Sequence, residues 1–246
     1  MAGKIIYRGN SLLDNEPIVV IAIESSRNRK TGNMLQTYIL CDNGKSPLEN
    51  NKTGSDYSIC GNCVHRGKPT ADVKRKIHIT ATERSCYVNL AQGVLIVWKN
   101  YMAGKYENAA GHTSIAKLGA DKMVRIGTYG DPSAVPSYVW ESLISKAKGH
   151  TAYSHQANVP TADFRPDLYM ASADSVAEAQ QYWQKNQRTF RVVSDYSEMV
   201  AGKEIACPAD TRDVQCVTCG LCKGSAISAK SIAIVAHGAG KSHFGN

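Results

Sequence analysis

Four cysteines lie within sixteen residues in the last quarter of this 246-residue chain. Cys207, Cys216, Cys219 and Cys222 follow the pattern C-P-x7-C-x2-C-x2-C. Thiolates spaced by two residues can surround one compact metal centre. A proline beside the outlying cysteine recurs in ferredoxin-type loops. A tetrahedral zinc site normally uses one C-x2-C pair, a spacer and a second pair. The pattern therefore favours a 4Fe-4S cluster, with zinc as the alternative.

A second group of thiols precedes the middle of the chain. Cys60 and Cys63 form a C-x2-C pair, and Cys86 follows further along. Three thiols can hold a 4Fe-4S cluster that keeps one iron open for a substrate or cofactor. They can also hold zinc, with His65 or His78 as the fourth ligand. The spacing decides neither the metal nor whether the seven cysteines form one site or two.

The composition is that of an ordinary globular protein. Hydrophobic residues make up 43% of the chain and charged residues 20%, which excludes disorder, collagen and coiled coil. The longest apolar run, 17–23, is too short to cross a bilayer, and the first residues lack the apolar stretch of a signal peptide. We therefore expect a cytoplasmic protein without a membrane partner. Grouped thiols in that reducing compartment indicate metal binding and not disulfides.

The net charge is positive. Twenty-nine Lys and Arg against 21 Asp and Glu give +8, a balance that attracts phosphates, nucleic acid or other anions. The densest basic stretches, 27–30 and 74–76, are short, and a solvated surface accounts for them equally well. Nucleic acid is therefore one candidate partner, and a small or nucleotide-like molecule is the other.

Hydrophobic patterning predicts the elements that must position these residues. Short segments rich in Ile, Val, Tyr and Thr predict strands at 4–8, 17–23, 33–40, 124–128, 151–155, 168–171, 189–193, 204–206 and 231–236. Apolar spacing and end signals predict helices at 90–102, 137–148 and 175–186, the last with Asp174 as its N-cap. Cys41, at the end of the third strand, is expected to be an ordinary buried cysteine. The alternation after residue 123 predicts a parallel sheet with crossover helices.

Polar residues that follow parallel strands collect at the carboxyl edge of the sheet, where such folds bind ligands. Six predicted strand ends carry such residues: Tyr129-Gly130-Asp131-Pro132, Ser154-His155-Gln156, Ser172-Ala173-Asp174, Ser194-Asp195, Cys207-Pro208 and His237-Gly238. Turns favour Ser, Asp and Gly for structural reasons too, but six such ends together predict a site. The candidate catalytic residues, which would orient a substrate, are Asp131, His155, Gln156 and Asp195. The candidate cofactor-binding residues are Tyr129, Gly130 and Ser172.

Seven strings resemble, in this order, a widespread family of uncharacterised proteins encoded by phages and mobile elements. They are SICGNC (58–63), RSCYVNL (84–90), RIGTYGDP (125–132), HTAYSHQ (150–156), MAS (170–172), TFRV (189–192) and TCGLC (218–222). The resemblance covers nearly the whole chain. It implies a bacteriophage protein, acting in the host cytoplasm, with no assigned activity.

A more distant resemblance is to phage-encoded radical S-adenosylmethionine-like proteins. These share a βα barrel, a Gly-Asp-Pro at a strand end and cluster-binding cysteines. The resemblance implies S-adenosylmethionine as a further cofactor. The C-x3-C-x2-C loop usual in radical S-adenosylmethionine proteins is absent here, because Cys60, Cys63 and Cys86 are spaced differently.

These observations predict one α/β domain over 1–246, a TIM-barrel-like parallel β/α barrel, complete or partial. Cys-rich loops at about 58–86 and 207–224 would be inserted in it. The predicted function is that of a phage-type iron–sulfur protein with at least one 4Fe-4S cluster. It would be a redox or radical-SAM-like enzyme for a small or nucleotide-like substrate. The alternatives are a non-catalytic nucleic-acid-binding protein with structural zinc, and a barrel that its cluster merely stabilises.

Overall fold

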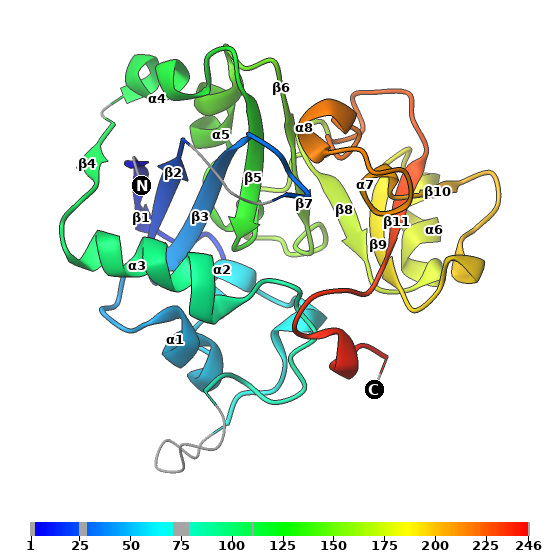
Figure 1. The fold of residues 1–246 in the computed structure, drawn as a ribbon, viewed down its shortest axis with the longest axis horizontal. Coiled ribbons are helices and arrows are strands. Elements are labelled where there is room, and N and C mark those ends of the chain that lie inside the picture. The colour runs from blue at the N-terminus through cyan, green and yellow to red at the C-terminus, as the bar shows by residue number, and fades with distance from the viewer. Residues whose placement is uncertain (1–2, 25–28, 71–78, 110, 246) are drawn as a thin grey trace.

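The computed structural model describes residues 3–24, 29–70, 79–109 and 111–245. The strands in these ranges form two sheets, which Figure 1 shows side by side. The first sheet has the order β4-β1-β2-β3-β5-β6, and the second has the order β10-β11-β9-β8-β7. Strands of the first sheet are β1 (Gly3–Asn10), β2 (Pro17–Ile23), β3 (Leu35–Cys41), β4 (Glu107–Asn108), β5 (Met123–Tyr129) and β6 (Gly149–Thr151). Strands of the second are β7 (Tyr153–Ser154), β8 (Met170–Ala173), β9 (Thr189–Val193), β10 (Glu204–Ala206) and β11 (Ser231–Val235).

The first sheet is mixed. Strands β1, β2 and β3 pair antiparallel, whereas β3, β5 and β6 pair parallel. The main hydrophobic core packs the apolar side chains of β2 and β3, among them Ile21 and Ile39, with Val97 and Trp140 from two helices. Because β2 lies in the middle of this core, nearly all of its seven residues are buried.

The second sheet is entirely parallel, as the βα pattern of the sequence predicts. Helix α6 (Val176–Gln184) crosses from β8 to β9. Its N-cap is Ser175, whose hydroxyl accepts a hydrogen bond from the Glu178 N–H at 3.1 Å, so the helix begins after Ser175 and not after the expected Asp174.

A single residue, Ala152, joins the two sheets between β6 and β7. Its N–H donates to the Cys222 carbonyl at 2.7 Å, and its carbonyl accepts from the Met170 N–H at 3.1 Å. The chain therefore passes directly from one sheet into the other. This junction lies beside one of the predicted cysteine loops.

The prediction of a TIM-barrel-like parallel barrel is wrong. The first three strands are antiparallel, and the described strands form two sheets that do not close on one another. Parallel neighbours need a crossover of a dozen or more residues, whereas β2 begins seven residues after β1 ends. A short connection of that kind returns the chain antiparallel.

The remaining helices are α1 (Pro47–Thr53), α2 (Tyr57–Cys60), α3 (Leu95–Met102), α4 (Gly111–Gly119), α5 (Ser137–Ile144), α7 (Pro208–Thr211) and α8 (Cys216–Cys219). The helix predicted at 90–102 is divided, because an irregular turn over Leu90–Val94 with a non-helical Gln92 precedes α3. Helix α4 was not predicted. None of the helices in the described part of the chain has the length and apolar composition that a membrane crossing requires.

A buried ion pair fastens the edge of the second sheet and provides a test of this fold. The Arg191 guanidinium donates to both carboxylate oxygens of Glu204 at 2.8 and 3.1 Å, and both side chains are almost fully buried. Glu204→Gln should lower the free energy of unfolding by about 3–5 kcal/mol, because it leaves a buried guanidinium without its counter-charge. Denaturant titration measures this. Glu107→Gln, in the exposed Lys4–Glu107 pair, is the matched control and should cause no measurable change. Equal losses of stability in the two variants would contradict the conclusion that the Arg191–Glu204 pair fastens the second sheet.

Candidate functional site

Both cysteine groups face one cavity of about 310 Å³. Its walls come from β5, β7, β8, β9 and β11, and from the loops that carry the thiols. Six of the seven predicted metal-binding cysteines line it: Cys60, Cys63, Cys86, Cys207, Cys216 and Cys222. Two thiol groups that are more than a hundred residues apart in sequence therefore share one site.

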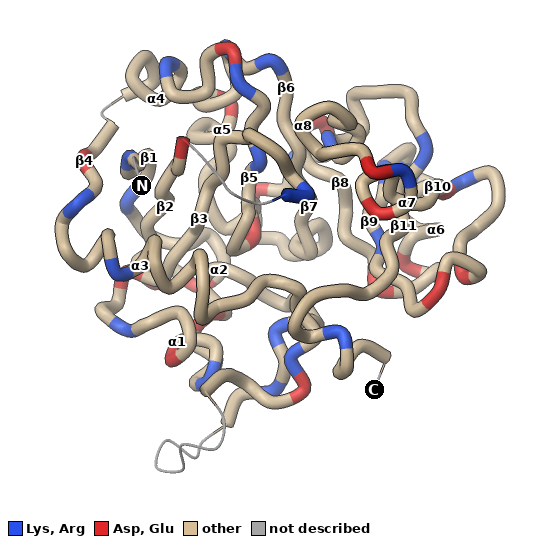
Figure 2. The backbone as a smooth tube through the Cα atoms, in the orientation of Figure 1, with Lys and Arg blue, Asp and Glu red and all other residues tan. Residues whose placement is uncertain are grey.

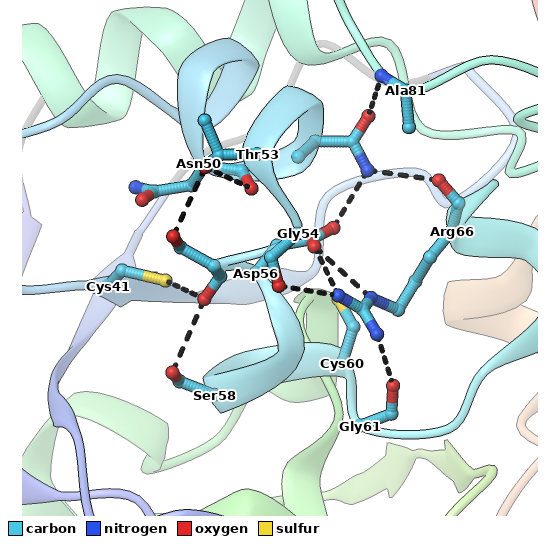
Figure 3. Close-up of polar contacts among 12 residues, drawn as sticks. Cys41, Asn50, Thr53, Gly54, Asp56, Ser58, Cys60, Gly61, Arg66 and Ala81 are labelled. Atoms are coloured by element: carbon cyan, nitrogen blue, oxygen red, sulfur yellow. Dashed lines mark hydrogen bonds and ion pairs between the residues drawn. The ribbon is translucent and has the colours of Figure 1, made fainter. Parts of the chain in front are cut away.

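The ion pair of Asp56 and Arg66 holds the first cysteine loop in place (Figure 3). The Arg66 guanidinium also donates to the carbonyls of Gly61 at 2.7 Å and Gly54 at 2.9 Å. The N–H of Cys60, the last residue of α2, donates to the Asp56 carbonyl at 2.9 Å. The guanidinium thus closes the loop on both sides of α2.

Asn51 connects this loop to the segment that leads to Cys86. Its side-chain amide donates to Asp56 at 2.8 Å and to the Arg66 carbonyl at 3.0 Å, and its oxygen accepts from the Ala81 N–H at 3.0 Å. The Cys86 N–H donates to the His65 carbonyl at 3.0 Å. The third thiol of the group is thereby attached to the loop that carries the first two.

The second cysteine loop is attached to a distant part of the chain. The Cys216 N–H donates to the Lys30 carbonyl at 3.0 Å, and the next N–H, of Val217, donates to the Thr31 carbonyl at 3.0 Å. Gly32, with φ of +71°, lies so close that a Cβ there would meet the Val217 side chain at 2.7 Å. Only glycine fits this close approach without displacing α8.

Arg188 fixes the part of this loop that follows α8. Its guanidinium donates to the carbonyls of Leu221 at 2.9 Å, Gly224 at 3.0 Å and Lys230 at 2.8 Å. Backbone carbonyls that lack a strand partner are satisfied in this way. Cys222 is consequently held between Arg188 and the Ala152 junction.

The thiols of each group affect one another electrostatically. Burial and, to a smaller extent, the negative charges of Cys207 and Cys216 together raise the pKa of Cys222 to about 12. Burial likewise raises the pKa of Cys60 well above its ordinary value, with Asp56 and Cys63 adding to the shift. Several buried thiolates can therefore coexist only if a cation compensates their charge.

Arg125 on β5 lies between the two groups and is almost fully buried. Its guanidinium donates to the hydroxyls of Tyr87 at 2.7 Å and Tyr153 at 2.6 Å, and these hydroxyls bond each other at 2.9 Å. Within the described ranges, no carboxylate pairs with it. A buried cation without a counter-charge is costly, so the cavity suits an anionic occupant.

Asp131, a predicted catalytic residue, lines the cavity and binds several elements together. Its carboxylate accepts hydrogen bonds from the Ser154 hydroxyl at 2.6 Å, the His155 N–H at 2.8 Å and the Ser133 N–H at 3.0 Å. Its own N–H donates to the Ile59 carbonyl at 2.6 Å. Burial raises the pKa of Asp131, and these hydrogen bonds partly oppose the shift.

His155 meets two further titratable side chains at the cavity wall. His155 Nε2 lies 3.4 Å from Asp174 Oδ1, and His65 Nε2 lies 3.7 Å from the same oxygen. Burial lowers the pKa of His65 to about 4, and the nearby His155 contributes. Burial alone would lower the pKa of His155, but Cys63 and Asp174 together raise it well above its ordinary value.

The other predicted site residues divide into two sets. Tyr129, Gly130 and Ser172 line the cavity. Gln156 is fully buried behind it, where its side chain donates to the Cys60 carbonyl at 2.9 Å and accepts from the Asn62 N–H at 3.2 Å. Asp195 lies outside the cavity wall, exposed, and caps the turn Tyr196–Glu198.

The remaining predictions concern individual cysteines and positions that the structure does not describe. Cys219 ends α8 beside Cys222, whose pKa it affects, without lining the cavity wall. Cys41 is buried, as expected, and its thiol donates to the Ser55 carbonyl at 3.4 Å. His78 and most of the two basic stretches, 27–28 and 74–76, lie outside the described residues.

Among the cavity residues that sequence reasoning missed are Arg125, Tyr87 and Tyr153. Asp174 was placed at a strand end and as a helix cap, without a role in the site. An arginine inside an otherwise apolar strand is the one signal that could have indicated Arg125, since a buried charge needs a reason.

No protein-family model, curated protein or solved structure matches this chain.

Asp131 provides a test of how the site is assembled. Asp131→Asn should lower the free energy of unfolding by about 2 kcal/mol, because the amide nitrogen cannot accept the bonds that one carboxylate oxygen now accepts. Chemical denaturation measures this. Asp195→Asn is the control, since asparagine caps a turn as well as aspartate does, and it should leave stability unchanged. A fully stable Asp131→Asn variant would show that these contacts do not hold the cavity together.

Proposed function

We propose that this protein is an iron–sulfur-dependent enzyme whose active site is the cavity between the two cysteine groups. The observation that carries the proposal is that six of the seven grouped cysteines line one cavity that also contains a buried arginine, which has no carboxylate partner among the described residues. A 4Fe-4S cluster on Cys207, Cys216, Cys219 and Cys222 would serve as an electron carrier. The chain's own residues would bind and orient the substrate beside it.

The spacing of the sulfurs differs from that of an assembled zinc site. Among the described residues, no three cysteine sulfurs lie within 4.8 Å of one another. Sulfurs bound tetrahedrally to one zinc ion at 2.3 Å would be about 3.8 Å apart. The preference for a cluster rests on the C-x2-C-x2-C pattern of the second cysteine group.

Arg125 supports the same proposal through charge. A 4Fe-4S centre with four thiolate ligands is anionic, and Cys216 is one of the groups that interact electrostatically with Arg125. The guanidinium would then have the counter-charge that the described residues do not give it. Tyr87 and Tyr153 would keep the Arg125 guanidinium oriented by accepting hydrogen bonds at their hydroxyls.

The group of Cys60, Cys63 and Cys86 suggests where a substrate would bind. Three thiolates leave one iron of a cluster without a protein ligand, so that position would be open to a substrate. A cavity of about 310 Å³ falls at the lower end of small-molecule sites, which suits a small or nucleotide-like anion. The Asp131 carboxylate would position His155 at this wall by accepting a hydrogen bond from the His155 backbone N–H.

No comparable observation favours a nucleic-acid-binding protein. Figure 2 shows the Lys and Arg of the described residues distributed over the whole fold and interspersed with Asp and Glu. A nucleic-acid interface normally concentrates its positive charge on one face or groove. Among these residues, the feature that we propose to bind an anion is the cavity.

Metal content after anaerobic purification tests the proposal directly. We expect iron and acid-labile sulfide at about four or eight per chain and broad absorption near 400 nm. Cys219→Ala should remove about four irons, because a ligand of the four-cysteine group is lost. Cys41→Ala is the matched control and should retain all the iron, since Cys41 lies in β3, away from the cavity. A colourless protein that contains only zinc would contradict the proposal.

Replacement of Arg125 tests the charge argument. Arg125→Met should make the midpoint potential of the adjacent cluster more negative by tens of millivolts, because a nearby positive charge favours the reduced state. Redox titration monitored by EPR measures this shift. Arg165→Met is the control: its guanidinium pairs with Glu141 and Asp167 outside the cavity wall, so it should not change the potential. An unchanged midpoint potential in Arg125→Met would show that the buried guanidinium does not interact electrostatically with the cluster.

A further inference from the structure

Three side chains that could bind a metal ion meet on the cavity wall. His65, His155 and Asp174 each present one ligand atom, and the three atoms lie within 4.8 Å of one another. The two histidine Nε2 atoms are 3.7 and 3.4 Å from the same Asp174 oxygen. Ligand atoms about 2.1 Å from one metal ion lie roughly 3.0–3.4 Å apart, so both histidine–aspartate distances are close to those of a formed site.

His65 gives the second, independent observation. Its side chain is buried, its Nδ1 bonds the Ser85 hydroxyl at 2.8 Å, and its buried Nε2 has no hydrogen-bond partner among the described residues. Metal-binding histidines typically have one ring nitrogen fixed by such an outer partner while the other faces the metal. The stacked Phe244 ring, 5.8 Å away between ring centres, further fixes the imidazole.

The imidazole rings of His65 and His155 lie edge to face. The imidazoles of His65 and His155 are nearly perpendicular, with 78° between their planes and 5.5 Å between their centres. All three side chains line the cavity, so the remaining coordination positions of an ion would face it. Two histidines and one carboxylate with open positions form the ligand set that suits iron(II) and similar first-row ions.

We infer that His65, His155 and Asp174 form a coordination site for one divalent first-row metal ion, beside Cys63 of the first cysteine group. The ion would hold an oxygen atom of the substrate in the cavity and polarise it as a Lewis acid. This inference does not depend on the presence of an iron–sulfur cluster. The proposed ion would be bound through nitrogen and oxygen atoms, whereas a cluster is bound through sulfur atoms.

Manganese(II) is the probe that distinguishes the two kinds of site, because imidazole and carboxylate bind it and thiolates select softer ions. The anaerobically purified protein, cleared of loosely held ions on a chelating resin, is titrated with Mn²⁺ while the EPR signal of the free ion is recorded. We expect one ion bound per chain. Asp174→Asn and His65→Gln should each weaken binding by at least about tenfold, and Ser85→Ala by about tenfold through the lost outer contact.

Matched controls separate this site from non-specific binding and from the clusters. Asp195→Asn and His112→Gln change the same residue types outside the cavity wall and should bind Mn²⁺ like the unaltered chain. Cys219→Ala, which should remove the four-cysteine cluster, should also bind it normally. Failure to bind one ion, unchanged binding in Asp174→Asn, or equal loss in the controls would overturn the inference. Loss of iron and sulfide alone would overturn only the proposed function.

Discussion

The buried carboxylate of Asp131 is the contact on which the arrangement of the cavity depends. It lies just after β5 of the first sheet and accepts bonds from residues at the end of β7 in the second, while its N–H reaches the carbonyl of Ile59 in α2. The carboxylate therefore connects the two sheets, and the backbone N–H of the same residue connects them to the first cysteine loop. A carboxylate can do this because its two oxygens accept several hydrogen bonds at once, and burial makes each bond costly to lose.

Three arginines then define the cavity around that connection. Arg66 closes the first cysteine loop through a carboxylate and two carbonyls, and Arg188 holds the second through carbonyls alone. Arg125 lines the cavity that both loops share, and among the described residues its guanidinium donates only to tyrosine hydroxyls. The first two guanidiniums are satisfied by the loops that they organise. The third leaves positive charge facing the cavity, where thiolates, a cluster or an anionic substrate would balance it.

Strand positions were largely predictable, and their arrangement was not. The segments at 17–23, 189–193 and 204–206 match β2, β9 and β10, because runs of Ile, Val and Thr between turn residues favour strands in any context. The barrel was wrong because periodicity does not show which neighbour a strand pairs with. The β6–β7 junction shows this well: one residue, Ala152, moves the chain between sheets, and its partners Cys222 and Met170 lie far along the sequence.

The sequence by itself determined the chemistry that is available: two groups of thiols, and polar residues at the ends of parallel strands. Their residue types and spacing are local properties, so no fold was needed to recognise them. Only the tertiary structure decided that both groups share one cavity, that Asp195 is merely a turn cap, and that His65 meets His155 and Asp174. Contacts between residues some ninety positions apart depend on how sheets and loops pack, and burial, which sets the electrostatics of every group in the cavity, exists only after that packing.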